Sequence, residues 1–128
     1  MRRHVAILIC GLSLAASTHA LAHHSFTAEF DADKPIKLTG TLTKVEWTNP
    51  HIWIFMDVKN ADGTMTNWGF EMPGTTQLLR AGIKSTTMKV GDVLTIDARR
   101  ARDGGNTANA QIVLVASSGK QLFPALAP

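Results

Sequence analysis

Cysteine and tyrosine are nearly absent from this chain, whose 128 residues include one cysteine and no tyrosine. The cysteine, Cys10, lies in an apolar run near the N-terminus that we expect to be removed from the mature protein. Without it, the mature chain forms no disulfide and offers neither a thiolate metal ligand nor a thiol nucleophile. Without tyrosine, no phenol can act as a proton donor. Histidine, methionine and carboxylate side chains are therefore the groups left for chemistry.

Catalytic motifs are missing as well. The sequence has no glycine-rich phosphate loop and no set of serine, histidine and aspartate with local support. Its scattered carboxylates lack the spacing of paired acid and base groups; they include Glu29, Glu46, Asp57 and Glu71. We therefore expect a binding protein rather than an enzyme.

The chain also lacks the excess of positive charge that nucleic-acid binding requires. Its formal net charge is +3, from 13 basic and 10 acidic residues. Loss of Arg2 and Arg3 with a leader would lower the 13 basic residues by two and leave a charge of about +1. The arginines within residues 99–102 are flanked by Asp97 and Asp103, which is typical of a solvated strand end rather than an anion site. We expect no nucleic-acid partner.

The first 22 residues have the pattern of a signal peptide. A short basic start precedes an apolar run at residues 5–16, which is too short to span a membrane. Ala20-Leu21-Ala22 then supplies small residues at the two positions that a signal peptidase needs, so we predict cleavage before His23. A cut after Ala20 is the alternative. We expect export to the periplasm, with no stable membrane anchor after cleavage.

The chain that remains after removal of 22 of the 128 residues is long enough for one small domain with one core. No internal repeat, coiled coil or low-complexity segment divides it. We expect a signal peptide at 1–22, an N-terminal arm at 23–36, the folded domain at 37–123 and a tail at 124–128.

Alternation of apolar and polar residues indicates that strands dominate the domain. Gly40 and Gly69, each within a predicted strand, suggest bends or bulges that help a sheet to close. Asp62-Gly63 predicts a hairpin, and Thr75 can cap a short helix that ends at Gly82. We predict strands at 36–47, 51–60, 65–72, 93–101 and 110–116, the helix between the third and fourth strands, and a polar loop at 103–109.

Three strands, a short helix and two further strands follow the order of the oligonucleotide/oligosaccharide-binding (OB) fold. We therefore predict a mainly β structure, a small five-stranded OB-like Greek-key barrel with one short helix between strands 3 and 4. A small open sandwich with the helix on its surface is the alternative. Either fold indicates where a site could lie but not what it does.

The second predicted strand has two different faces. Isoleucine, methionine and valine alternate on one face and are expected in the core, whereas Trp53 and Phe55 share the other face with His51. An outward aromatic face requires a cover or a partner. The arm can cover it with Phe26 and Phe30, which would carry the arm's histidines towards His51. The candidate ligand-binding residues, which could equally serve as packing, are Trp47, Trp53, Phe55 and Trp68.

Several motifs stand out along the chain: AHHSF at the cleavage site, LTGTLTKVEWTNPHIWI, NWGFEM, and a VGD turn followed by a polar RAxDGxNxAN loop. Together they resemble a family of small exported bacterial proteins that is labelled only as a domain of unknown function. The Trp-Thr-Asn-Pro-His stretch is the most specific part. The resemblance covers nearly all of the mature chain and implies an exported, single-domain β protein, but it implies no activity.

A histidine at the mature N-terminus is suited to binding copper. Its amine and its imidazole can bind one ion together, and a second imidazole completes a three-nitrogen set that suits Cu(II). We predict a copper or other transition-metal site formed by His23, His24 and His51 and shielded by Trp47 and Trp53. Binding would weaken below about pH 6 to 7, as the amine and imidazoles take up protons. The candidates for a fourth donor are His24, Glu29, Met56 and Met72.

Other interpretations stay open at this point. Adjacent histidines can be no more than a polar start to the chain, and His51 can cap backbone groups in a turn. A cut after Ala20 would place His23 third, a position that also chelates Cu(II). The alternative function is a metal-free periplasmic module that binds a small ligand or a protein partner on its aromatic face.

Overall fold

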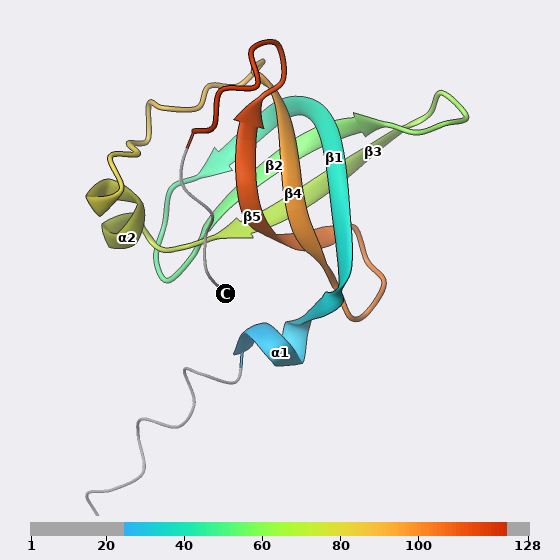
Figure 1. Ribbon diagram of the computed structural model, residues 1–128, viewed down its shortest axis with the longest axis horizontal. Helices are drawn as coiled ribbons and strands as arrows, with labels where there is room; N and C mark the ends of the chain where they lie inside the picture. The colour runs from blue at the N-terminus through green and yellow to red at the C-terminus, as the bar shows by residue number, and fades with distance from the viewer. Residues whose placement is uncertain (1–24, 123–128) are drawn as a thin grey trace, which may run out of the picture.

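Five strands and two short helices make up the computed structural model, which describes residues 25–122 (Figure 1). The predicted mainly β structure with a short helix between the third and fourth strands is confirmed. Within these residues, no helix is long and apolar enough to cross a membrane. The elements are α1 (Ser25–Glu29), β1 (Phe30–Glu46), β2 (Ile52–Lys59), β3 (Met65–Met72), α2 (Thr75–Arg80), β4 (Val93–Ala101) and β5 (Thr107–Val115).

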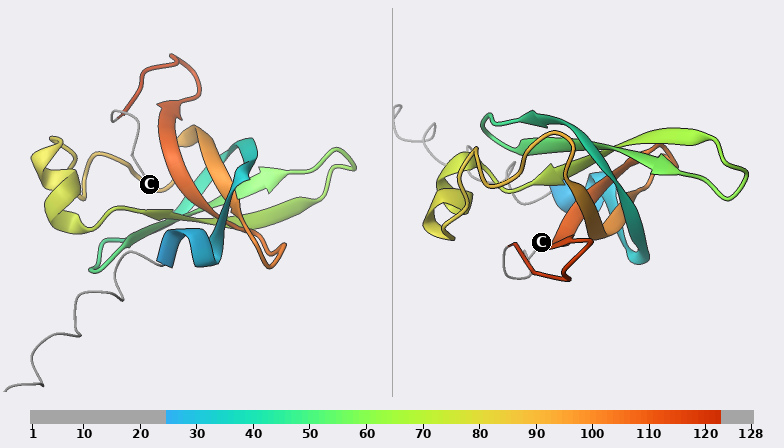
Figure 2. Two further views of the ribbon diagram at one scale, coloured as in Figure 1. Left: turned by 60° about the horizontal axis from the view of Figure 1, so that its bottom comes forward. Right: turned by 90° about the horizontal axis from the view of Figure 1, so that it is seen from above.

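The strands form one mixed sheet that closes into a ring in the order β1-β2-β3-β5-β4. All neighbours are antiparallel except β3 and β5, which run parallel. The long strand β1 completes the ring because Thr41 pairs with Asp57 of β2 on one side and with Val93 of β4 on the other. Figure 2 shows the strands wrapped around a common interior, with α2 and the β2–β3 hairpin at opposite ends.

The interior is filled by the side chains that alternation assigned to it. On β2, every second residue from Ile52 to Val58 is buried, as predicted, and Leu94, Ile96 and Ala98 are buried on β4. Burying each large aliphatic side chain contributes roughly 1.5–3 kcal/mol relative to exposure. The largest fully buried side chains are Phe70, Leu42, Ile52, Ile54, Met56, Met72, Leu78, Ile83, Leu94, Ile96 and Val113.

Two strands begin earlier than their sequence patterns predicted. β1 starts at Phe30 instead of residue 36, because Phe30 is buried opposite Ala101 at the end of β4. β5 starts at Thr107, inside the predicted loop at 103–109, because this end of the strand pairs with β3. In both cases a distant pairing extends a strand through residues that are locally polar.

Gly40 allows β1 to cross closely over β2. A Cβ atom at this position would lie only 2.5 Å from the carbonyl oxygen of Asp57. The irregularity in β1 pairing that the sequence suggested at Gly40 lies instead between Leu42 and Lys44. The role of this glycine is therefore close backbone approach rather than a bulge.

Replacing Gly40 with alanine should destabilise the protein by about 1–3 kcal/mol, because backbone must move to admit the methyl group. Chemical denaturation of the wild type and the Gly40→Ala variant measures this difference. Gly105→Ala is the matched control, since its methyl would meet only the side chain of Asp103. Equal destabilisation by the two substitutions would contradict this account of Gly40.

Candidate functional site

The turn before β2 is fixed against the start of α2. The Oδ1 atom of Asn49 accepts hydrogen bonds from the backbone N–H and the hydroxyl of Thr75, at 3.0 and 2.9 Å. Gly74 lies so close to this turn that a Cβ atom there would be 2.6 Å from the carbonyl oxygen of Pro50, which follows a cis peptide bond. Thr75 was predicted to cap the helix, but Gly74 is the N-cap residue and Asn49 provides the capping oxygen.

This turn places His51 beside a buried carboxylate. The Nδ1 atom of His51 lies 2.7 Å from Oε1 of Glu71, near the end of β3. The Glu71 side chain is only 8% exposed, whereas that of His51 is 43% exposed. The second carboxylate oxygen, Oε2 of Glu71, is buried and has no hydrogen-bond partner within residues 25–122. Such an orphaned oxygen is uncommon in a folded protein.

The surroundings of Glu71 favour its protonated form. Burial raises the pKa of the Glu71 carboxyl, nearby His51 lowers it, and nearby Glu29 raises it further. Burial dominates because removal from water penalises the charged form. Whether the proton is on Nδ1 of His51 or on Oε1 of Glu71, these two atoms are close enough to form a hydrogen bond with each other. The other ring nitrogen of His51, Nε2, forms no hydrogen bond to the described part of the chain.

Helix α1 is held next to this pair by Arg102. The Nε atom of Arg102 donates a hydrogen bond of 2.7 Å to the carbonyl of Thr27, and its backbone N–H donates one of 2.9 Å to Glu29. Its guanidinium also lies 3.7 Å from the carboxylate of Asp31. These contacts attach α1 to the end of β4, and they position Glu29 close enough to affect the pKa of Glu71.

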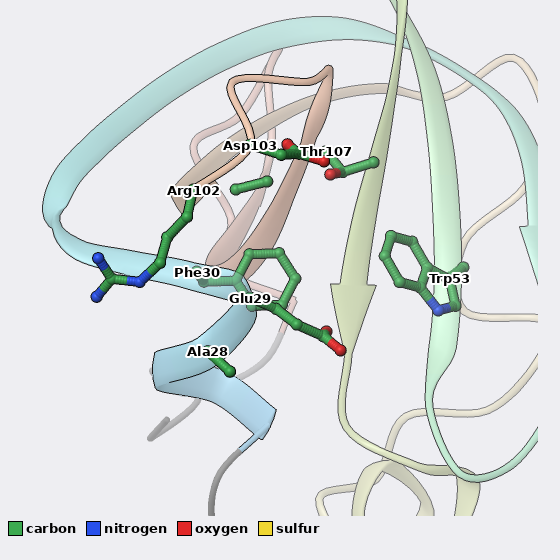
Figure 3. Close-up of a pocket in the computed structure, with 8 residues that line it drawn as sticks. Ala28, Glu29, Phe30, Trp53, Arg102, Asp103 and Thr107 are labelled. Atoms are coloured by element: carbon green, nitrogen blue, oxygen red, sulfur yellow. The ribbon is translucent and has the colours of Figure 1, made fainter.

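An open pocket of about 320 Å³ lies between α1 and β2 (Figure 3). In the figure, the carboxylate of Glu29 extends toward the side of Trp53, and the guanidinium of Arg102 extends away from it. Helix α1 thus lies near Trp53 but leaves a space beside its ring, and Phe26 packs against Phe30, with ring centres 5.8 Å apart. The lining residues are Ala28, Glu29, Phe30, Trp53, Ala101, Arg102, Asp103 and Thr107.

The predicted aromatic residues do not share one surface. Trp53 and Phe55 are half-buried on the outer face of β2, with ring centres 6.4 Å apart. Trp47 is half-buried against the core. Trp68 is buried on the inner face, where the Arg100 guanidinium carbon lies 5.5 Å from its ring centre. Only Trp53 and Phe55 therefore form an outer aromatic pair.

The predicted metal ligands are divided between two parts of the chain. His51 is in place beside Glu71, whereas His23 and His24 lie outside the described residues. Met56 and Met72, named as possible donors, are both buried in the core. Across residues 25–122, no group of three histidine, cysteine, aspartate or glutamate side chains is arranged to hold a metal ion.

Glu71 is the site residue whose importance the sequence did not reveal. In β3, Glu71 alternates with Phe70 and Met72 of the core, and a carboxylate on the opposite face is normally solvated. Its burial results from its neighbours: it pairs with Trp53 of β2 and with Asn109 of β5. The sequence signal that could have indicated a buried carboxylate is the position of Glu71 in NWGFEM, among apolar residues and two residues after Gly69.

A family model matches residues 12–110 of the chain. The chain belongs to DUF6152, a family of unknown function. The sequence motifs likewise resembled a family of unknown function. No curated protein and no solved structure matches the chain. For this DUF6152 protein, function must therefore be inferred from the site.

Replacing Glu71 with glutamine should change how stability depends on pH. Because the folded protein raises the pKa of Glu71, the wild type should lose stability as the pH rises from about 4.5 through that raised pKa, where the buried carboxyl must ionise. Glutamine stays neutral, so Glu71→Gln should gain stability relative to the wild type over this interval. Denaturation at a series of pH values measures the difference.

The more exposed Glu46, which pairs with Lys44, provides the control. Glu46→Gln should leave the pH profile close to that of the wild type. A wild-type advantage over Glu71→Gln that grows with pH would show that the His51 contact outweighs burial, contrary to this assignment.

Proposed function

We propose that the mature protein is an exported copper-binding protein of the periplasm, with a site formed by His51, His23 at the mature N-terminus and the adjacent His24. The observation that carries the proposal is the contact between His51 and the buried carboxylate of Glu71. The proposal includes a signal peptide at residues 1–22 that is cleaved before His23.

The contact between His51 and Glu71 is the arrangement expected behind a histidine ligand. Metal-binding histidines usually donate one ring N–H to a carboxylate or carbonyl, which fixes the ring and leaves the other nitrogen for the metal. Here Nδ1 of His51 is 2.7 Å from Oε1 of Glu71, and the half-exposed ring leaves Nε2 accessible. A cation at Nε2 would also favour the ionised form of Glu71, offsetting part of the cost of its burial.

The position of α1 supports a role for the N-terminal histidines. Glu29, the last residue of α1, influences the pKa of Glu71, so this end of α1 lies near the His51 contact. Four residues of helix from Ser25 to Glu29 span about 6 Å. Two further residues reach back at most about 7 Å to His23. The length of the chain therefore allows His23 to reach the pair.

The donor set would favour copper among common divalent ions. One amine and two imidazoles provide nitrogen ligands, for which Cu(II) has the highest affinity in the series of first-row divalent ions. Trp53, half-buried on the strand that follows His51, would limit access of water to the site. Protonation of the amine and imidazoles below about pH 6 to 7 would release the ion.

The strand arrangement supports an OB-like Greek-key barrel as the scaffold. The ring order β1-β2-β3-β5-β4, the parallel pairing of β3 with β5 and the helix between β3 and β4 all suit that fold. In this scaffold the proposed metal site lies where β2 begins and β3 ends, beside the chain that precedes β1.

Titration of the authentic mature protein with Cu(II), followed by electron paramagnetic resonance, tests the proposal. We expect one equivalent to give a nitrogen-rich signal that His51→Ala alters, because an imidazole ligand is lost. One extra residue before His23 should also alter the signal. Glu71→Gln should weaken binding by about 10- to 100-fold through loss of its support for His51.

Glu46→Gln serves as the control and should bind copper as the wild type does. Mass measurement of the exported protein first establishes its N-terminus. Absence of stoichiometric binding, or a signal that His51→Ala leaves unchanged, would refute the site.

The outer aromatic pair supports a second candidate, a metal-free module that binds a ligand or a periplasmic protein. Trp53 and Phe55 are only half-buried, and Trp53 borders the pocket beside α1. A large aromatic surface next to an open pocket is typical of a binding site for a small molecule. In this case Trp53→Ala should abolish binding, and removal of metal should have no effect.

A further inference from the structure

We propose that the pocket between α1 and β2 binds a small organic cation, an amine or quaternary ammonium group, against the indole of Trp53 and the carboxylate of Glu29. This pocket does not include the histidines proposed to bind copper, and it defines a ligand class for the metal-free candidate.

The size of the pocket suits a small molecule. Its volume of about 320 Å³ is at the lower end of the range of 300 to 1,000 Å³ typical of ligand pockets. Phe30 and Ala101, both buried, supply an apolar base, and Trp53 forms the opposite side (Figure 3). Methyl or methylene groups could therefore be covered by apolar surface on more than one side.

The charges around the pocket favour a cation. Glu29 and Asp103 contribute two carboxylates to the lining. Arg102 is the one basic residue of the lining, but its guanidinium is bonded to the Thr27 carbonyl and faces Asp31. Figure 3 shows it directed away from Trp53. The field inside the pocket is therefore negative.

The indole of Trp53 is available for a cation–π contact. Its neighbour Phe55 already has the Lys44 ammonium 5.4 Å from its ring centre, and Trp68 has Arg100. No basic side chain of the described residues occupies the same position over Trp53. Tryptophan is the best aromatic partner for an ammonium group within about 6 Å. Glu29 reaches toward this ring from α1 and can neutralise the same charge.

Choline and 3,3-dimethylbutan-1-ol provide a matched pair of probes, since they have the same shape and differ in charge. Isothermal titration of the mature protein at low ionic strength, with excess chelator to exclude copper, compares them. We expect choline to bind at least tenfold more tightly than the neutral alcohol. The affinity for choline should fall several-fold when salt is raised to 0.5 M, because exposed carboxylates are then screened.

Glu29→Gln and Trp53→Leu should each weaken choline binding by about fivefold or more. Asp97→Asn, which removes a carboxylate paired with Lys37 outside the pocket lining, should leave it unchanged. Equal affinity for the two probes, no binding of choline at millimolar concentration, or unchanged binding by Glu29→Gln would each overturn the proposal. Because chelator is present throughout, these results do not depend on whether the protein binds copper.

Discussion

The closed sheet depends on β1, because this long strand pairs with β4 along one stretch and with β2 along the next. Its residues 35–41 pair with β4, and residues 41–46 pair with β2. Gly40 lies beside the crossing point, where a side chain would collide with the backbone at Asp57. Closure directs one face of every strand to a common core, so the outer faces of β2 and β3 are left for other contacts. Trp53 and Glu71 lie on those outer faces, where α1 approaches them.

The Asn49-Pro50-His51 turn connects the sheet to the site. Asn49 holds the start of α2, and Gly74 permits Pro50 to lie against it. These contacts fix the chain immediately before β2, so His51 reaches Glu71 at the end of β3. In the most specific motif of the sequence, Asn49 and Pro50 therefore have a structural role, while His51 remains partly exposed. This division explains how one short stretch can serve both folding and binding.

Features that depend on neighbouring residues could be predicted from the sequence. Features that depend on pairing between strands far apart in the sequence could not. Alternation identified the inner residues of β2, because the two-residue period of a strand can be recognised from consecutive residues. It missed the start of β5, because Thr107 to Asn109 are held by parallel pairing with β3. The burial of Glu71 likewise follows from its position on β3 between β2 and β5. For the proposed metal site, His51 was a candidate from the sequence, but nothing in the sequence indicated that Glu71 would lie beside it.

Glu71 connects the two proposed binding sites. A buried carboxylate with an unpaired oxygen is costly, and its one described ion-pair partner is the half-exposed His51. A hydrophobic residue at this position would pack against Trp53 without that cost. Both proposed ligands are cations, one at His51 and one beside Glu29, and each would favour the ionised form of Glu71. Binding of either proposed cation would therefore be coupled to release of the proton that burial favours on Glu71.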